Sequence, residues 1–227
     1  MTAVTPASGE PFADASTAPG VRGFLHPARS GGSRDGIVLA HGAGGNAAAP
    51  LLVALASALS ARGITVLRCD LPFRQARPTG PPRPGDAAID REGLRHAVAA
   101  LRRLGLERVF AGGHSYGGRQ ASMLAADTPG LVDALLLLSY PLHPPRRPDQ
   151  PRTAHLPRLE TPTLLVHGAT DGFGSRDEID QARRLIPART KLLIVERAGH
   201  DLLHGRRPSP RAPELVAQIV DELLAFV

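Results

Sequence analysis

The 227-residue sequence contains no tryptophan, one cysteine and one lysine. With Cys69 alone, the chain cannot form an internal disulfide bond, and no cluster of cysteine and histidine has the spacing of zinc ligands. No apolar run approaches the ~18 residues of a membrane span, and the first twenty residues contain no apolar core of signal-peptide length. These absences predict a soluble, cytoplasmic protein with no membrane partner and no metal site.

Aromatic residues are scarce, with six phenylalanines and two tyrosines. None of them is interleaved with the basic clusters, so the chain offers no stacking platform for bases. The formal net charge of +6 rests on arginine, because Lys191 is the only lysine. We predict a small-molecule substrate and no nucleic-acid partner, and we expect a monomer or a homodimer.

Length and composition predict one domain. The chain is 42% hydrophobic and 21% charged, which is ordinary for a folded protein, and 227 residues can bury a sizeable core. We predict this domain over residues 20–227, preceded by a flexible or edge-strand arm over residues 1–19. The stretches 72–85 and 144–158 are rich in proline and arginine and are predicted loops.

Short apolar runs alternate with longer segments that have apolar residues at three- and four-residue spacing, such as Leu94, Val98 and Leu101. Candidate strands span residues 21–26, 37–41, 64–69, 108–112, 134–140, 163–167 and 191–196. Candidate helices span residues 48–62, 86–104, 117–127, 175–186 and 213–226. Most strand runs are apolar on both faces, as in a parallel sheet that helices cover on each side. The alternation predicts an α/β fold with a doubly wound, mostly parallel sheet. Little sequence remains beyond these elements, so we expect no separate cap domain.

One serine lies among glycines where a strand is predicted to turn into a helix. The segment Gly-His-Ser-Tyr-Gly, residues 113–117, follows the candidate strand 108–112. It matches the G-x-S-x-G nucleophile elbow, in which a strained turn lifts the serine hydroxyl out of the sheet and small neighbours let strand and helix approach closely. The alternative is a tight connection without chemistry. The pattern makes Ser115 the candidate nucleophile.

A serine nucleophile needs a base, and the base needs an orienting carboxylate. Asp171 follows the candidate strand 163–167 and His200 follows the candidate strand 191–196, so both are predicted at the sheet edge that holds Ser115. The chain order serine, aspartate, histidine is that of an α/β-hydrolase triad. Each residue also has a simpler interpretation: Asp171 as a turn former or helix cap, and His200 as a solvated loop residue.

Two neighbours compete for these roles. Asp201 is an alternative acid, but residues adjacent in sequence rarely aim their side chains at each other. His204 lies farther from the end of the strand than His200 and is the weaker candidate base. Asp171 and His200 are preferred, because three separate loops would otherwise have to supply the right residue types in the right order by chance.

The segment His-Gly-Ala-Gly-Gly-Asn, residues 41–46, comes at the end of another candidate strand. Cleavage of an acyl group generates an oxyanion, which backbone N–H groups of this loop and of Tyr116 are suited to hold. We assign Ala43 as the first donor, with Gly44 as the alternative. A phosphate-binding loop is the rival interpretation, but no Gly-Lys-Ser/Thr ending follows. We therefore predict no cofactor.

The segments HGAGGN, CDLPFR, GGHSYGGR, HGATDGFGS and AGHD together resemble the α/β-hydrolase superfamily. Within it they resemble a small dienelactone-hydrolase-like family whose relatives include a testis-expressed protein and a subunit of a chromatin-acetylating complex. The resemblance implies that Ser115 is the nucleophile, Asp171 the acid and His200 the base. Dienelactone hydrolases proper carry cysteine at the elbow, whereas this chain has serine, and some relatives serve as scaffold subunits.

Arginine gathers in three predicted loops at the same sheet edge, residues 70–86, 140–161 and 199–211. They contain ten arginines and five acidic residues, a net charge of +5. This excess predicts steering of anionic substrates, and the alternative is a merely solvated basic surface. We place Arg74 and Gly44 on the substrate-binding surface.

The preferred function is a serine hydrolase that cleaves a small ester or thioester through an acyl-enzyme, with a preference for anionic substrates. The alternative is a non-catalytic protein of the same fold that binds a partner through its basic loops.

Overall fold

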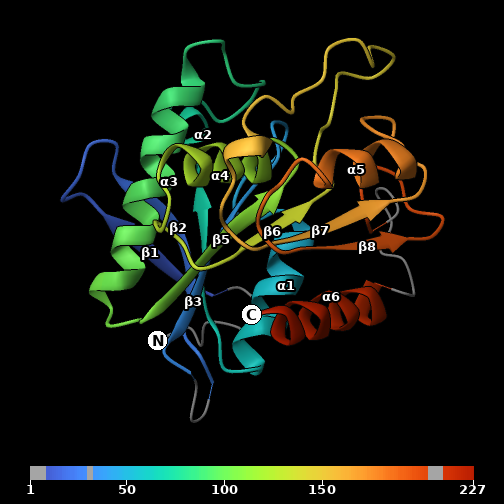
Figure 1. Ribbon diagram of the computed structural model, residues 1–227. Coiled ribbons are helices and arrows are strands. Elements are labelled where there is room, and N and C mark those ends of the chain that lie inside the picture. The colour runs from blue at the N-terminus through green and yellow to red at the C-terminus, as the bar shows by residue number, and fades with distance from the viewer. Residues whose placement is uncertain (1–8, 30–32, 204–211) are drawn as a thin grey trace.

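The computed structural model describes residues 9–29, 33–203 and 212–227. Within these ranges eight strands form one sheet, in the order β1-β2-β4-β3-β5-β6-β7-β8 (Figure 1). The strands are β1 (Glu10–Asp14), β2 (Val21–His26), β3 (Asp35–Ala40), β4 (Thr65–Asp70), β5 (Arg108–His114), β6 (Leu135–Leu138), β7 (Thr163–Gly168) and β8 (Thr190–Val195). Strands β3 to β8 run parallel, and β1 and β2 add an antiparallel edge. This is the predicted doubly wound, mostly parallel sheet.

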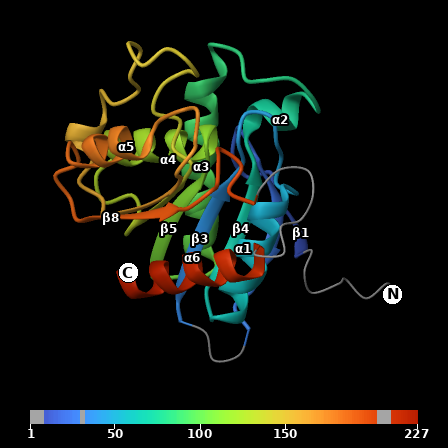
Figure 2. The same ribbon diagram turned by 90° about the vertical axis from the view of Figure 1, so that its right-hand side faces the viewer.

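Helices cover both faces of the sheet. One face carries α1 (Pro50–Ala61) and α6 (Ala212–Phe226), which pack side by side, and the other carries α3 (Asp86–Arg103), α4 (Tyr116–Asp127) and α5 (Arg176–Arg183) (Figures 1 and 2). Among the described residues, none of the helices has both the length and the apolar character needed to cross a membrane.

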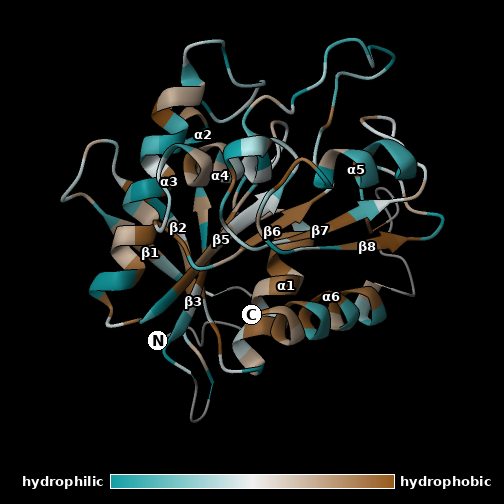
Figure 3. Ribbon diagram, in the orientation of Figure 1, coloured by the Kyte–Doolittle hydropathy of each residue, from teal (hydrophilic) through white to brown (hydrophobic). Residues whose placement is uncertain are grey.

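Side-chain alternation along the central strands builds the two cores. In β3, Ile37 and Leu39 pack into the core with α1 and α6, whereas Val38 and Ala40 pack into the core with α3 and α4. Successive side chains of a strand point to opposite faces, so a strand covered on both sides must be apolar throughout. The central strands are accordingly coloured as hydrophobic in Figure 3.

The predicted arm contains a strand at the sheet edge, which is one of its two predicted forms, and a predicted loop contains a short helix. Strand β1 lies within the predicted arm 1–19 and pairs with β2 at the sheet edge, whereas residues 1–8 of that arm lie outside the described residues. The predicted loop 72–85 begins with a short helix, α2 (Pro72–Ala76), which starts at a proline. Proline is tolerated there because the first N–H groups of a helix have no acceptor within it, so the missing N–H costs no hydrogen bond.

The predicted strand 134–140 is shorter than expected, because Ser139 adopts a positive φ of 48° directly after β6. The loop that follows folds back on the body of the protein. The Tyr140 hydroxyl donates to the Arg152 carbonyl at 2.6 Å, and the Arg152 N–H donates to the Leu142 carbonyl at 2.7 Å. It then forms the 3-10 turn Leu156–Arg158, which packs against α4. The described residues thus contain no separate cap domain, as predicted.

Candidate active site

Ser115 occupies a strained turn between β5 and α4. Its backbone has φ 51° and ψ −115°, a conformation that costs a non-glycine residue on the order of 1–3 kcal/mol. The Ser115 N–H donates to the Leu138 carbonyl at 2.8 Å, which ties the turn to β6. A side chain at Gly117 would place its Cβ 2.6 Å from the His41 carbonyl oxygen, so only glycine allows α4 to begin this close to β3.

The structure brings Ser115, His200 and Asp171 into one hydrogen-bonded line. His200 Nε2 lies 2.8 Å from Ser115 Oγ, and His200 Nδ1 lies 3.0 Å and 2.9 Å from the two Asp171 carboxylate oxygens. The Nδ1–H therefore donates to the carboxylate, which leaves the Nε2 lone pair facing the serine hydroxyl. This arrangement can take the Ser115 proton.

Backbone contacts fix the Asp171 carboxylate next to the histidine. Asp171 is 5% exposed, and its Oδ1 accepts the Phe173 N–H at 2.8 Å. The N–H and the hydroxyl of Thr170 both donate to the Ala198 carbonyl at 2.9 Å, so the two loops that carry acid and histidine are joined. A Cβ at Gly168 would lie 2.3 Å from the Gly199 carbonyl oxygen, so this close approach of the loops requires glycine.

Two rings and one backbone contact orient His200. The Phe173 ring lies against the imidazole with 4.1 Å between ring centroids. His114 Nε2–H donates to the His200 carbonyl at 2.9 Å, and burial lowers the pKa of His114, so this ring acts as a neutral donor. Phe173 lies within the segment HGATDGFGS, but the sequence gives no signal for its contact with the histidine.

Asp201 is not the carboxylate that contacts His200 Nδ1. Asp201 lines the same cavity, and its Oδ1 accepts the Leu203 N–H at 3.2 Å, whereas the carboxylate against His200 Nδ1 is that of Asp171. His204 lies outside the described residues.

The loop of residues 41–46 faces Ser115 across the cavity. The Gly45 N–H donates to the Gly42 carbonyl at 3.0 Å, which closes the turn. Ala43, Gly44 and Tyr116 line the cavity together with Ser115. As the first residue of α4, Tyr116 has an N–H without an intrahelical acceptor, and such groups are suited to bind an anionic oxygen.

Side chains below this loop hold its carbonyl groups. His41 Nδ1–H donates to the Gly42 carbonyl at 2.8 Å, and burial lowers the pKa of His41. Arg74 is 7% exposed and donates to the carbonyls of Gly45 at 2.8 Å and Ala43 at 3.0 Å. It also donates to the Gly80 carbonyl at 3.0 Å. The Arg74 guanidinium therefore points at the loop backbone, whereas the sequence analysis expected it to contact substrate.

A buried carboxylate that the sequence analysis missed holds Tyr116. The Tyr116 hydroxyl donates to Asp90 Oδ2 at 2.7 Å, and the Phe73 N–H donates to Asp90 Oδ1 at 2.9 Å. Asp90 is fully buried, and burial raises its pKa. One signal was present, since an acid four residues before Leu94 lies on the apolar stripe of a predicted helix.

The cavity that contains Ser115 has a volume of about 700 Å³. Its arginines are Arg119, from the first turns of α4, and Arg152, from the loop after β6. The other described arginines of the three basic loops do not line this cavity. Arg146 and Arg147 are exposed and do not line this cavity, and Arg77 forms an ion pair with Asp86. Arg206, Arg207 and Arg211 lie outside the described residues.

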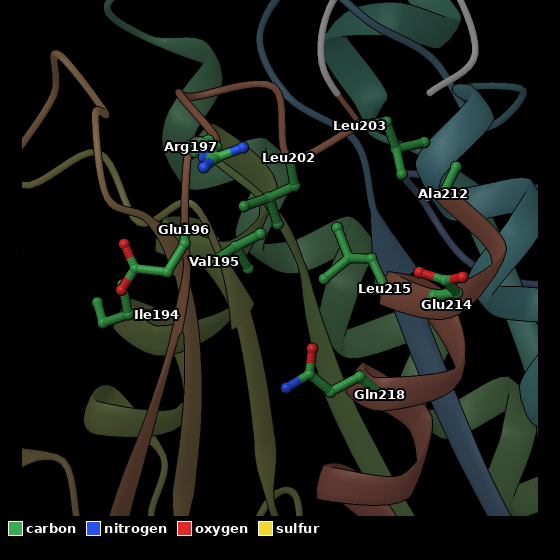
Figure 4. A pocket seen from close by; sticks show the side chains of 10 residues that line it. All are labelled: Ile194, Val195, Glu196, Arg197, Leu202, Leu203, Ala212, Glu214, Leu215 and Gln218. Atoms are coloured by element: carbon green, nitrogen blue, oxygen red, sulfur yellow. The ribbon is translucent and has the colours of Figure 1, made fainter. Parts of the chain in front are cut away.

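A second cavity of about 320 Å³ lies between the end of β8 and the start of α6 (Figure 4). Leu202, Leu203 and Leu215 give it an apolar wall, and Arg197 and Glu214 also line it. None of the described residues that line it is a serine or a histidine.

The family model of the alpha/beta hydrolase domain matches residues 33–227. The chain belongs to the alpha/beta hydrolase family. The sequence-based assignment to this superfamily is therefore confirmed, and the fold agrees with solved structures of other members.

An alpha-beta serine hydrolase homologue from Coxiella burnetii has a TM-score of 0.75 at 18% identity, over 98% of this chain and 100% of that chain. The dienelactone hydrolase from Anabaena variabilis has a TM-score of 0.72 at 23% identity, over 96% and 99% of the two chains. Est1E from Butyrivibrio proteoclasticus has a TM-score of 0.74 at 16% identity, over 96% and 98%. These structures agree in fold along nearly the whole chain.

Proposed function

We propose that this alpha/beta hydrolase is a serine hydrolase that cleaves a small ester or thioester through an acyl-enzyme. The observation that carries the proposal is the position of His200, which lies within hydrogen-bond distance of Ser115 Oγ through one ring nitrogen and of Asp171 through the other. A serine hydroxyl becomes a nucleophile when an adjacent base accepts its proton and a carboxylate fixes the base.

In the first half-reaction, Ser115 Oγ attacks the carbonyl carbon while its proton moves to His200 Nε2. The imidazolium that forms is stabilised by Asp171, which accepts the Nδ1–H. When the tetrahedral intermediate collapses, the Nε2 proton passes to the leaving alcohol or thiol, and the acyl group stays on Ser115.

In the second half-reaction, water takes the place of the leaving group. His200 Nε2 accepts a proton from the water as its oxygen attacks the acyl carbon. Collapse of the second intermediate returns that proton to Ser115 Oγ and releases the carboxylic acid. Enzyme and proton balance are restored, so no cofactor is required.

The N–H groups of Ala43 and Tyr116 are the proposed oxyanion donors, with Gly44 on the neighbouring cavity wall. Donors that are fixed before the reaction stabilise the developing charge without reorganisation. This requirement gives Arg74 a role different from the expected one. We assign it as a positioning residue that holds the carbonyls on both sides of Gly44, and not as a substrate ligand.

A panel of p-nitrophenyl esters and acyl thioesters tests the proposal, with the wild-type protein and Ser115→Ala compared. We expect wild-type turnover with a burst of released leaving group, and no burst from the variant. An absence of turnover by both proteins across the panel, together with an unmodified Ser115, would favour the non-catalytic binding protein instead. Relative rates on matched oxygen esters and thioesters identify the acyl-transfer type.

A further inference from the structure

Two arginines on the wall of the Ser115 cavity have no acidic partner. Arg119 and Arg152 line the cavity, and neither forms an ion pair with any acidic residue in the described ranges. Arg77, Arg108 and Arg158, in contrast, each pair with an aspartate. The cavity therefore contains two cations whose charge the described carboxylates leave uncompensated.

The two guanidinium groups make few hydrogen bonds with the described residues, and the one indicated for the Arg119 side chain is with the Tyr140 hydroxyl. Arg119 Nε is buried without a hydrogen-bond partner among the described residues. Within the described ranges, the one side-chain hydrogen bond of Arg152 joins Nη1 to the Pro141 carbonyl at 3.3 Å. A guanidinium that lines a cavity with few partners is best satisfied by the paired oxygens of a carboxylate or phosphate.

The arginines belong to one cluster. Arg152 has its pKa lowered by burial and further by the charge of Arg119, so the two like charges are close enough to repel each other. Tyr140 interacts with both arginines. Its hydroxyl donates to the Arg152 carbonyl at 2.6 Å, and the charge of Arg119 opposes the burial that raises its pKa to about 12. An anion between the arginines would relieve this repulsion.

The position of the pair fits a group attached to the substrate. Arg119 comes one helical turn after Ser115, and its N–H donates to the Ser115 carbonyl at 3.0 Å, so it is fixed to the turn that carries the nucleophile. Arg152 is held by its backbone hydrogen bonds with Leu142 and Tyr140. Among the described residues that line the cavity, Asp201 is the one acid, and it follows His200 in sequence.

We propose that Arg119 and Arg152 form an anion subsite that binds a carboxylate or phosphate group carried by the ester or thioester substrate. This inference rests on the proposed function for turnover, but anion binding by the subsite can be measured without it. It also replaces the broader prediction of steering by the basic loops, because it assigns selectivity to two residues inside the cavity.

Matched esters test the subsite. p-Nitrophenyl hemisuccinate is compared with p-nitrophenyl pentanoate for an acyl-side carboxylate, and glycerol phosphate monobutyrate with monobutyrin for an alcohol-side phosphate. We expect the wild-type protein to favour the anionic member of one pair in kcat/KM, and which pair responds identifies the source of the anion. Arg119→Gln and Arg152→Gln should each lower the ratio of anionic to neutral kcat/KM by about 10-fold to 100-fold, because each removes a charge-assisted contact.

The ratio cancels any effect of a substitution on steps that both esters share. Arg146→Gln and Arg147→Gln are the matched controls, because they remove the same charge from exposed positions outside the cavity, and they should leave the ratio unchanged. Arg119→Lys should restore part of it. A wild-type ratio near one for both pairs, with both neutral esters hydrolysed, would overturn the subsite and leave the proposed function standing.

If the protein hydrolyses none of the probes, anion binding is measured by calorimetric titration of Ser115→Ala with monomethyl succinate and with glycerol phosphate. We expect binding of one anion, and its loss in Ser115→Ala proteins that also carry Arg119→Gln or Arg152→Gln. Absence of binding by either anion, or binding that survives both substitutions, would overturn the subsite. If the anion binds in this way, but the wild-type protein neither hydrolyses any probe nor is labelled at Ser115, the subsite is upheld and the serine-hydrolase proposal is overturned.

Discussion

Arginine serves the two walls of the active-site cavity in opposite ways. Behind the wall formed by residues 42–45, Arg74 is buried, and it donates to the carbonyls of Ala43, Gly45 and Gly80. On the wall formed by α4 and the loop after β6, Arg119 has a buried Nε with no partner among the described residues. The first arginine has its donors occupied by backbone carbonyls, and the second lines the cavity without an acidic partner among the described residues.

The difference shows that the function of a cation depends on its acceptors and not on its place in a basic segment. Arg74 and Arg152 belong to the arginine-rich predicted loops, yet one supports the loop proposed to hold the oxyanion and the other faces the cavity. Arg119 lies outside those loops, on a helix. A charge count over the loops therefore describes their average potential but does not identify the residues that meet the substrate.

The largest effect is expected from substitution of the nucleophile or the base. Ser115→Ala and His200→Ala should each lower kcat for a p-nitrophenyl ester by roughly 10³-fold or more, because nucleophile and base act as one unit. The double variant should be little worse than either single variant. Circular dichroism checks that the fold is intact. Near wild-type kcat in Ser115→Ala would remove the serine from the mechanism.

The next effect separates the two aspartates near His200. Asp171→Asn should lower kcat by roughly 10²-fold or more, because an amide can donate to Nδ1 and so place a proton on Nε2, where the base must be unprotonated. Asp201→Asn should change kcat by less than about 3-fold, since the carboxylate that contacts the imidazole Nδ1 is that of Asp171. Kinetics on a neutral ester test the ranking, and the reverse order would make Asp201 the acid.

A smaller effect tests the proposed role of Arg74 in positioning the loop of residues 41–46. Arg74→Ala should lower kcat by about 10-fold on anionic and neutral esters alike and leave KM nearly unchanged, because loosening the oxyanion donors weakens transition-state binding on every substrate. The exposed Arg146→Ala serves as the control. A selective loss on the anionic ester would show instead that Arg74 contacts the substrate, and the contrast between the walls would disappear.

The smallest effect at neutral pH concerns stability, and it grows as the pH falls. Burial lowers the pKa of His155 from 6.5 to about 4, and also lowers that of His26 to about 4. Between these values the unfolded chain binds protons that the folded chain does not, so the free energy of unfolding should fall as pH decreases from about 6.5 to 4. His155→Gln should reduce this dependence by roughly 2–3 kcal/mol between pH 6.5 and 4. Urea unfolding of both proteins at a series of pH values measures it, and equal slopes would contradict the assignment.

Much of the fold and of the triad could be predicted because the signals are local. Buried parallel strands are apolar runs, and Ser115, Asp171 and His200 each follow such a run directly, so their meeting at one sheet edge follows from the topology. The elbow glycines have a local signature as well.

The remaining parts of the site depend on contacts between distant segments. Arg152 reaches the cavity because its loop folds back onto Leu142, and Asp90 meets Tyr116 across two helices. Arg74 looked like a substrate ligand because it follows a strand, but its donors are occupied by carbonyls of a different loop. No spacing within one segment encodes these contacts.

The most direct measurement is covalent labelling of the protein by a fluorophosphonate, read by intact mass and by mapping of the modified peptide. A serine activated by His200 should take up one phosphonyl group, carried by Ser115, and the label should be absent from Ser115→Ala and greatly slowed in His200→Ala. Wild-type protein that stays unlabelled, or a label on a different residue that survives in Ser115→Ala, would contradict the proposal that Ser115 is an activated nucleophile.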